Sequence, residues 1–344
     1  MPNAQHKASH NFGFISLFPS CGMTKPFSLV VIFKKNTDIK MIKLKLALDW
    51  TPNVNHIGFL IASELGFYNQ QGIGLEILNP KDDNYSITPG KKLELDLADF
   101  AIAPFETVIS LNNKVHQVQA VAIYAILQKD LSCIATLKSS NIVSPSLLDG
   151  NTYASYKARY EDHIVKEMII NDGGKADLKI IYPEKLGIWN TLLSGKADAT
   201  WIFDNWEGIE ARAKHIELNH FQLADFNIPY GYSPIVLTKK ENITKHKGLY
   251  SKFIKATQKG FLYTKNNLTE STKILSSYVT EYDLNNIDLE KAISFSIPHF
   301  GDESNAGLMK QERVSSFTNW LIERGLEGQQ ILNQSLFTND LLTC

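Results

Sequence analysis

The fold is decided by residues 42–68, IKLKLALDWTPNVNHIGFLIASELGFY, which form one complete unit of strand, loop and helix. Apolar and polar side chains largely alternate in its first seven residues, and this period of two predicts a β-strand. A loop from Thr51 to Asn55 follows, and apolar residues then recur at helical spacing over residues 56–68. Such a unit is the building block of an α/β fold with a parallel sheet.

The same alternation of short apolar segments and helical patterns continues along the chain. It predicts further strands at residues 75–78, 97–103, 118–123, 132–136, around 153 and at 178–182. After residue 239 the pattern becomes helical, with apolar residues three and four apart in segments 250–263, 270–278, 287–295 and 312–324. We therefore expect a helical C-terminal region that packs on the first part of the chain.

Length and internal similarity both predict two α/β lobes. A chain of 344 residues favours roughly two domains of about 150 residues each. Residues 93–102, LELDLADFAI, resemble residues 193–202, LSGKADATWI, and each segment places Ala-Asp ahead of an apolar strand. We expect a first lobe of residues 41–135 plus 235–344 and a second lobe of residues 136–234. Ligands of open α/β sheets bind beyond the carboxyl ends of the strands, so the predicted site lies between the lobes.

Composition excludes several classes of protein. Lys and Arg number 35 against 36 Asp and Glu, so no broad positive field is present to attract nucleic acid. No segment reaches the roughly 18 consecutive apolar residues of a membrane span. The cysteines Cys21, Cys133 and Cys344 are odd in number and far apart, which suits neither a disulfide framework nor a zinc site with paired ligands. We predict no metal site and no cofactor.

Residues 1–40 have no periodic pattern and form either a poorly ordered leader or a mis-assigned start. They contain no apolar segment with the length and flanks of a secretory signal. Met41 opens the first strand, so we expect translation to begin there, which favours a cytoplasmic location. The alternative is a periplasmic or lipid-anchored protein.

Aromatic and acidic residues recur just after the predicted strands, and they are the candidate ligand-binding residues. A flat heteroaromatic ring stacks on Trp or Tyr, while a carboxylate accepts hydrogen bonds from an exocyclic amine. An aminopyrimidine has both features. For any one tryptophan taken alone, a place in the core is the simpler interpretation, and the joint occurrence of these residues favours a site. The residues are Trp50, Glu106, Trp201, Asp204, Trp206, Glu207 and Tyr232.

A second candidate segment is Ser155 to Arg159, which follows a predicted strand and precedes a helix. Backbone donors at such a position commonly bind an anion. The segment contains no glycine, so its side chains hinder the close backbone approach that a phosphate needs. Ser155 and Tyr156 are retained as ligand-binding candidates, and no nucleophile and base pair identifies a catalytic residue.

Residues 48–59, LDWTPNVNHIGF, carry a family resemblance that other segments extend. The chain resembles the thiamine-pyrimidine family, which joins bacterial pyrimidine-precursor-binding proteins to the fungal hydroxymethylpyrimidine phosphate synthase. The further segments are GFY at 66–68, GIGL at 72–75, ADFAIAP at 98–104 and WEGIE at 206–210. The resemblance implies a two-lobed periplasmic-binding-protein fold of type II, the venus-flytrap type, which closes on its ligand.

The resemblance also implies site residues on both lobes. Trp50, Asn53, His56 and Glu106 would line the first lobe, and Trp201, Asp204, Trp206 and Glu207 would face them from the second. Tyr232 would lie at the crossover. From the residues alone, Asn53 and Asn55 are also interpreted as helix caps, because Asn accepts hydrogen bonds from exposed backbone donors at a helix start.

The sequence departs from the fungal synthase at the positions that the synthase uses for chemistry. That enzyme resembles a catalyst that builds the pyrimidine from pyridoxal phosphate and its own histidine, with a lysine and an iron-bearing cysteine-rich stretch. Here Ala103 stands where the lysine would fall, Thr107 where the histidine would fall, and residues 230–234, YGYSP, replace the cysteines. Without an amine at that position no Schiff base forms.

We therefore expect a non-catalytic binder of a formylaminopyrimidine or hydroxymethylpyrimidine type of thiamine precursor, serving biosynthesis or salvage. A secreted or lipidated form would supply an ABC transporter permease. The alternative is an enzyme on the same scaffold, a pyrimidine phosphate synthase or a precursor-processing enzyme. In that alternative Glu106, Asp204 or Glu207 would act as acid or base.

Overall fold

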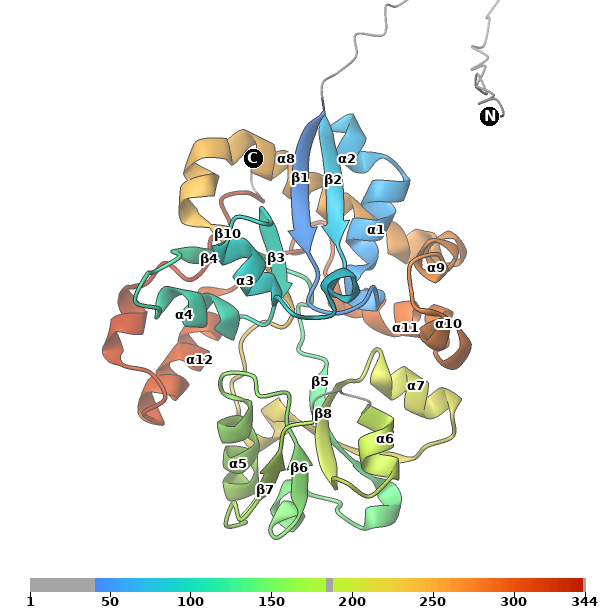
Figure 1. Cartoon of the computed structure of the whole chain (residues 1–344), viewed down its shortest axis with the longest axis vertical. Coiled ribbons are helices and arrows are strands. Elements are labelled where there is room, and N and C mark those ends of the chain that lie inside the picture. The colour runs from blue at the N-terminus through green and yellow to red at the C-terminus, as the bar shows by residue number, and fades with distance from the viewer. Residues whose placement is uncertain (1–40, 184–187, 343–344) are drawn as a thin grey trace, which may run out of the picture. The chain divides into compact units, whose positions relative to one another are not determined.

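The computed structural model describes residues 41–183 and 188–342, with side chains described outside residues 184–190. The expected leader, residues 1–40, lies outside the described residues. Within them the chain forms two five-stranded mixed sheets with helices against them, so the predicted two-lobed α/β architecture is confirmed (Figure 1). No helix among the described residues has both the length and the apolar character needed to cross a bilayer.

The first sheet has the strand order β2-β1-β3-β10-β4. Its strands are β1 (Ile42–Ala47), β2 (Ile73–Leu78), β3 (Phe100–Ala103), β4 (Ala120–Ala125) and β10 (Ile235–Lys239). Strand β1 pairs in parallel with β2 and β3, whereas β10 runs antiparallel to both β3 and β4. Every side chain of β3, β4 and β10 is buried, because helices cover both faces of the sheet.

The second sheet repeats this plan with the order β7-β6-β8-β5-β9. Its strands are β5 (Ser132–Leu137), β6 (Thr152–Ala154), β7 (Lys179–Ile181), β8 (Ala199–Phe203) and β9 (Leu218–Gln222). Strand β6 pairs in parallel with β7 and β8, and β5 lies antiparallel to β8 and β9. Strands β6, β7 and β8 thus correspond to β1, β2 and β3, and the two similar sequence segments lead into β3 and β8.

The chain crosses between the sheets twice. The first crossing joins β4 to β5 and lies within residues 126–131, so the predicted boundary at 135 falls inside β5, all of which belongs to the second sheet. The polar run Gln128-Lys129-Asp130 marks this crossing in the sequence, and the predicted boundary lies beyond it. The second crossing precedes Ile235, where β10 begins.

Twelve α-helices and several single 3₁₀ turns are described. The α-helices are α1 (Ile57–Glu64), α2 (Phe67–Gln70), α3 (Pro89–Glu94), α4 (Glu106–Asn112), α5 (Glu161–Asn171), α6 (Ile188–Leu193), α7 (Glu207–Ala213), α8 (Lys240–Tyr263), α9 (Leu268–Ser276), α10 (Glu281–Asn286), α11 (Leu289–Ser296) and α12 (Gln311–Glu323). The 3₁₀ turns are Val54–His56, Pro80–Asp83, Lys138–Ser140, Pro145–Leu148, Leu223–Phe226, Thr264–Asn266, Ile297–His299 and Gln329–Asn333.

The helical C-terminal region packs on the first sheet mainly through α8. Phe253 of α8 stacks on Phe100 of β3 with ring centroids 4.1 Å apart, and α1 crosses α8 where two glycines meet. A Cβ atom on Gly260 would lie 1.9 Å from the backbone oxygen of Gly58, so the two helices approach too closely for any side chain there. Helix α8 therefore packs on the first lobe, as predicted for the helical C-terminal region.

Helix α12 departs from that expectation because it also contacts the second lobe. Phe317 of α12 packs edge-on against Tyr160, which directly precedes α5. Beyond the helix, Arg324 pairs with Glu167 of α5 at 2.7 Å, and Glu327 accepts from the Tyr160 hydroxyl at 2.6 Å. The C-terminal region thus connects the two lobes on one side.

Candidate functional site

A cavity of about 230 Å³ lies between the two sheets. Its lining comes from the loops that follow β1, β3, β6 and β8, together with side chains of β8 itself and of the second crossing. These are the carboxyl ends of the parallel strands, which is the location expected for ligands of open α/β sheets. Seven of the predicted residues line it: Trp50, Asn53, Glu106, Tyr156, Trp201, Trp206 and Glu207.

The first-lobe wall is set by the loop between β1 and α1. Trp50 packs against Tyr85 with centroids 5.4 Å apart, which leaves Trp50 partly exposed to the cavity. Asn53 caps the following turn, because its side-chain oxygen accepts from the backbone N–H of Asn55 at 2.9 Å. The predicted capping role of Asn53 is therefore present alongside its place in the cavity lining.

His56 lies beneath this loop and holds its shape. The ring is fully buried, and its Nδ1 accepts from the backbone N–H of Asn53 at 3.1 Å. Nε2 therefore carries the proton and donates to Asp49 Oδ1 at 2.8 Å. His56 therefore holds two lining residues, Asp49 and Asn53, in place through hydrogen bonds and does not itself line the cavity.

Glu106, the first residue of α4, projects a buried carboxyl into the cavity from the first lobe. The hydroxyl of Tyr230 donates to its Oε2 at 3.0 Å. Burial raises the pKa of Glu106 to about 7, and the nearby Glu161 carboxylate adds to this, whereas the hydrogen bond from Tyr230 and the charge of Arg159 act in the opposite direction. Near neutral pH this carboxyl is present in both its protonated and ionised forms.

The second-lobe wall contains Trp201 of β8, which meets the ring of Tyr230 edge-on at 5.5 Å. Tyr156, in the loop after β6, lies close by and packs on the small apolar cluster around Ile202. Burial raises the pKa of Tyr156 well above that of an ordinary phenol, so its hydroxyl stays protonated and can donate. Two aromatic side chains of this wall thus flank the cavity.

Glu207, the first residue of α7, is the acidic group of the second-lobe wall. Its Oε2 accepts from the backbone N–H of Phe203 at 2.9 Å. Burial raises the pKa of Glu207 to about 7, with the charge of Glu210 as an additional cause. Glu106 and Glu207 therefore enter one cavity from opposite lobes with similar acidities.

Two further carboxyls, Asp49 and Glu161, line the cavity and were not among the predicted residues; Glu161 is the buried one. Glu161 is the first residue of α5, and it accepts from the Tyr153 hydroxyl at 2.7 Å and from the backbone N–H groups of Tyr156 and Ala158. It therefore fixes the loop that the sequence marked as an anion-binding candidate. The shared signal was available: Glu106, Glu161 and Glu207 each begin the helix that follows a strand.

Tyr230 is a further lining residue that was not among the predicted ones. The expected site residue is Tyr232, the second tyrosine of the segment Tyr230-Gly231-Tyr232. In the structure Tyr230 lines the cavity, whereas the Tyr232 ring is buried under the Arg313 guanidinium at 4.1 Å. The Tyr232 hydroxyl accepts from the backbone N–H of Lys310 at 2.9 Å, so Tyr232 joins the crossing to the C-terminal region.

Ser155 and Asp204 also lie outside the cavity lining. The Ser155 hydroxyl donates to Asp162 Oδ1 at 2.6 Å and accepts from the backbone N–H of Lys157, which shapes the loop. Asp204 directs its carboxylate toward β9, where Gln222 donates to its Oδ2 at 2.9 Å. Four residues that were predicted to bind the ligand thus lie outside the cavity lining: His56, Ser155, Asp204 and Tyr232.

The lobes are in contact across the cavity through Asn205. Its side chain is fully buried, and Nδ2 donates to Asn55 Oδ1 at 2.8 Å and to Ser296 Oγ at 3.0 Å. Trp206 and Ile209, which follow it, pack within the apolar core of the first lobe. The second lobe is thus closed against the first in this structure.

The cavity does not suit pyridoxal phosphate. None of the described residues that line it is a lysine or an arginine, and Ala103 and Thr107 occupy the positions that the fungal synthase would need for its lysine and histidine. A phosphate would also meet four carboxyls, those of Asp49, Glu106, Glu161 and Glu207, with no lysine or arginine among the described lining residues. The lining residues therefore fit neither the phosphate group nor the Schiff-base chemistry of that cofactor.

Comparison with known proteins gives a family-model match and several relatives. The model described as NMT1/THI5 like matches residues 53–271, which is more than half of the chain. A formylaminopyrimidine-binding protein of Halalkalibacterium halodurans is 23% identical over 236 residues, covering 67% of this chain and 69% of the relative.

Solved structures share the fold at low identity. The ligand-binding component of an ABC-type import system from Staphylococcus aureus, solved with zinc bound, is 13% identical with a TM-score of 0.64 and covers 87% of this chain and 97% of that one. The periplasmic nitrate-binding protein NrtA from Synechocystis is 12% identical with a TM-score of 0.63 and covers 88% of each chain. These likenesses confirm the expected periplasmic-binding-protein fold. They show the fold alone, so the location of the protein stays a prediction.

Proposed function

Because the chain belongs to the NMT1/THI5-like family, we propose that its cleft binds an aminopyrimidine precursor of thiamine, of the formylaminopyrimidine or hydroxymethylpyrimidine type. The name of the Halalkalibacterium halodurans relative, a formylaminopyrimidine-binding protein, supports this ligand class. The volume of about 230 Å³ supports a single-ring ligand, because pockets for drug-sized molecules are roughly 300–1,000 Å³.

One observation carries the proposal: two carboxyls with a pKa of about 7, Glu106 and Glu207, enter the cavity from opposite lobes. An aminopyrimidine presents a ring nitrogen that accepts a hydrogen bond beside an exocyclic amine that donates one. A protonated carboxyl has the complementary pair, an O–H donor and a C=O acceptor. In both residues Oε2 already accepts a hydrogen bond within the protein, from the Tyr230 hydroxyl at Glu106 and from the Phe203 backbone N–H at Glu207.

Aromatic side chains supply the other contact that a pyrimidine needs. Trp50 lies on the first-lobe wall and Trp201 on the second, so a flat ring between the lobes meets an indole on each side. Stacking of a base on an aromatic ring contributes about 1–3 kcal/mol. Closure through Asn205 then buries the ring between the two walls.

The charges of the cavity argue against the anions that some fold neighbours bind. Lining carboxyls come from Asp49, Glu106, Glu161 and Glu207, and no lysine or arginine is among the described lining residues. Binding nitrate there would bury an anion beside acidic groups, with no lysine or arginine in the described lining to offset its charge. The electrostatics therefore favour a neutral or protonated nitrogen heterocycle.

The test is calorimetry on the full chain, with formylaminopyrimidine, hydroxymethylpyrimidine and nitrate as separate titrants. The expected result is one-to-one binding of an aminopyrimidine and no heat from nitrate. Binding of nitrate with no response to either pyrimidine would overturn the proposal. We further propose that the loaded protein delivers its ligand to an ABC transporter permease, which cellular uptake of labelled pyrimidine with and without this protein would test.

A second candidate function, precursor processing, is favoured by the same pKa values. Groups that titrate near the working pH are suited to act as general acid and base. Mass spectrometry of the pyrimidine after prolonged incubation with the protein separates the two functions. An unchanged ligand supports binding alone, and a stoichiometric excess of a modified product supports the enzyme.

A further inference from the structure

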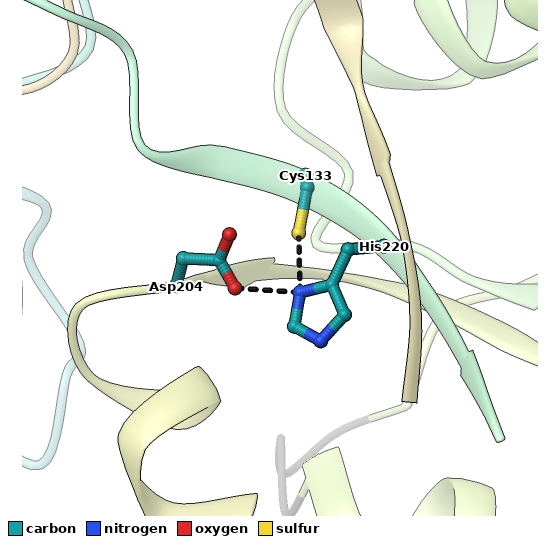
Figure 2. A group of neighbouring side chains, drawn as sticks. All are labelled: Cys133, Asp204 and His220. Atoms are coloured by element: carbon teal, nitrogen blue, oxygen red, sulfur yellow. Dashed lines mark hydrogen bonds and ion pairs between the residues drawn. The ribbon is translucent and has the colours of Figure 1, made fainter. Parts of the chain in front are cut away.

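Three side chains that can bind a metal converge on the second sheet, outside the cavity. Cys133 lies on β5, His220 on β9, and Asp204 directly after β8 (Figure 2). The pairing of β5 with β9 sets Cys133 opposite Gln222 and Ala135 opposite His220, so both side chains lie on one face. Cys133 Sγ is 3.6 Å from His220 Nδ1, and Nδ1 is 2.6 Å from Asp204 Oδ1.

This arrangement is not that of a nucleophile with its base. In a catalytic triad the acid holds one ring nitrogen and the nucleophile meets the other. Here Asp204 and Cys133 both meet Nδ1, as Figure 2 shows, so Asp204 cannot orient the ring toward the thiol. Burial also raises the pKa of Cys133 well above its usual value, which disfavours a reactive thiolate.

The buried oxygen of Asp204 lacks a well-directed hydrogen bond. Oδ2 accepts from Gln222, but no donor reaches Oδ1 with hydrogen-bond geometry among the described residues, although His220 Nδ1 is near. An acidic oxygen, an imidazole nitrogen and a sulfur therefore face one point. A cation at that point would satisfy all three.

The distances suit zinc. Zinc binds sulfur at about 2.3 Å and nitrogen or oxygen at about 2.0–2.2 Å in a tetrahedron, which places sulfur and nitrogen roughly 3.5 Å apart. The observed separation of Sγ and Nδ1 is 3.6 Å. The 2.6 Å approach of Oδ1 to Nδ1 would widen to roughly 3.4 Å in such a tetrahedron, a shift that rotation of the Asp204 side chain supplies.

We propose that Cys133, Asp204 and His220 form a three-ligand site for Zn²⁺, with the fourth position open. The His220 side chain is 26% exposed, which gives the ion a route of entry. As the sulfur–zinc bond forms, the Cys133 proton passes to solvent, and the thiolate and carboxylate balance the two charges of the ion. The sequence did not indicate the site because Cys133 and His220 lie 87 residues apart.

The site adjoins the cleft through the backbone of the second lobe. Asp204 directly follows Phe203 and precedes Trp206 and Glu207, and those three residues line the cavity. An ion held by Asp204 would join the end of β8 to β5 and β9. It would thereby fix the position of the wall that carries Glu207.

The test is a Co²⁺ titration of the full chain with Cys21→Ser and Cys344→Ser, so that Cys133 supplies the single thiol. The expected result is a thiolate-to-cobalt charge-transfer band that saturates at one equivalent and disappears when Zn²⁺ is added. The band should be absent in Cys133→Ser and His220→Ala and retained in His116→Ala, an exposed histidine elsewhere in the described chain. No band in the parent protein, or a band that survives Cys133→Ser, would overturn the proposal.

X-ray absorption of the zinc-loaded parent protein keeps the proposal falsifiable if a variant fails to fold. One sulfur neighbour with nitrogen or oxygen neighbours supports the site, and a shell without sulfur contradicts it. Neither measurement uses a pyrimidine, so its outcome is independent of the proposed ligand.

Discussion

Glu106 and Glu207 hold the same place in the two lobes and face the same cavity. Glu106 begins α4 after β3, and Glu207 begins α7 after β8, the corresponding strand of the other sheet. Burial raises the pKa of each to about 7. The two-fold repetition of one structural unit thus places a titratable carboxyl on each wall of the cleft.

Glu207→Ala is expected to weaken aminopyrimidine binding by roughly 10- to 100-fold, because the variant loses a paired donor and acceptor and each neutral hydrogen bond contributes about 0.5–1.5 kcal/mol. Calorimetry measures this change. The matched control is Glu210→Ala on the same helix, whose carboxylate bonds Tyr282 outside the cavity. Equal losses of affinity in both variants would contradict the assignment of Glu207.

Trp201→Ala is expected to lower affinity by roughly 10- to 100-fold through loss of a stacking face, and Trp201→Phe should recover part of it. Fluorescence titration and thermal unfolding measure binding and stability side by side. Trp320→Ala provides the contrast, since Trp320 is buried on α12 away from the cavity lining. Trp320→Ala should lower the thermal stability and leave the affinity unchanged. If Trp201→Ala also leaves the affinity unchanged, Trp201 does not belong to the site.

Glu106 should make the ligand-free protein less stable as pH rises from about 4.5 to 7. Its folded-state pKa of about 7 lies above the ordinary value of 4.5, so in this window the folded state binds more protons than the unfolded state. The free energy of unfolding therefore falls as pH rises through the window. The cost reaches about 3 kcal/mol at most. Groups that face Glu106 are Tyr230, Glu161 and Arg159.

The measurement is the free energy of unfolding in urea at several pH values for the parent protein and for Glu106→Gln. The free energy of unfolding of the parent protein should fall relative to that of Glu106→Gln between pH 4.5 and 7. Above pH 7 the difference between the two proteins should become constant. Parallel curves would show that Glu106 titrates normally.

Asn205→Ala should weaken ligand binding by about tenfold, because the side chain of Asn205 holds the lobes together at Asn55 and Ser296. The effect should come through a smaller closed population, which small-angle scattering detects as a larger radius of gyration. Asn171→Ala is the control, since Asn171 bonds Phe226 within the second lobe. An unchanged radius of gyration together with weakened binding in Asn205→Ala would contradict this role.

Gly260→Ala should destabilise the protein by about 1–3 kcal/mol or more, because the new Cβ would lie 1.9 Å from the Gly58 oxygen. Gly248→Ala on the same helix meets nothing within 4 Å, and it should be neutral or stabilising by up to about 1 kcal/mol. Chemical denaturation compares the two. Similar stabilities would show that α1 and α8 can separate without cost.

The sequence by itself determined the strand and helix units, the two-lobed plan and the carboxyl-end loops that carry the site, because these follow from local periodicity and from the rule for open α/β sheets. It also indicated Trp50, Glu106, Trp201 and Glu207, which line the cavity. The choice between Tyr230 and Tyr232 needed the tertiary structure, since the two residues share one segment but Tyr230 lines the cavity and Tyr232 contacts Arg313 and Lys310.

The tertiary structure alone decided which residues meet across long separations. Strand pairing brings Cys133 to His220, and lobe contact brings Asn205 to Asn55, although nothing in their local sequence records either neighbour. The acidities of Glu106 and Glu207 were also decided there. Their pKa values depend on burial, which is set by the packing of the whole chain and not by the residues beside them.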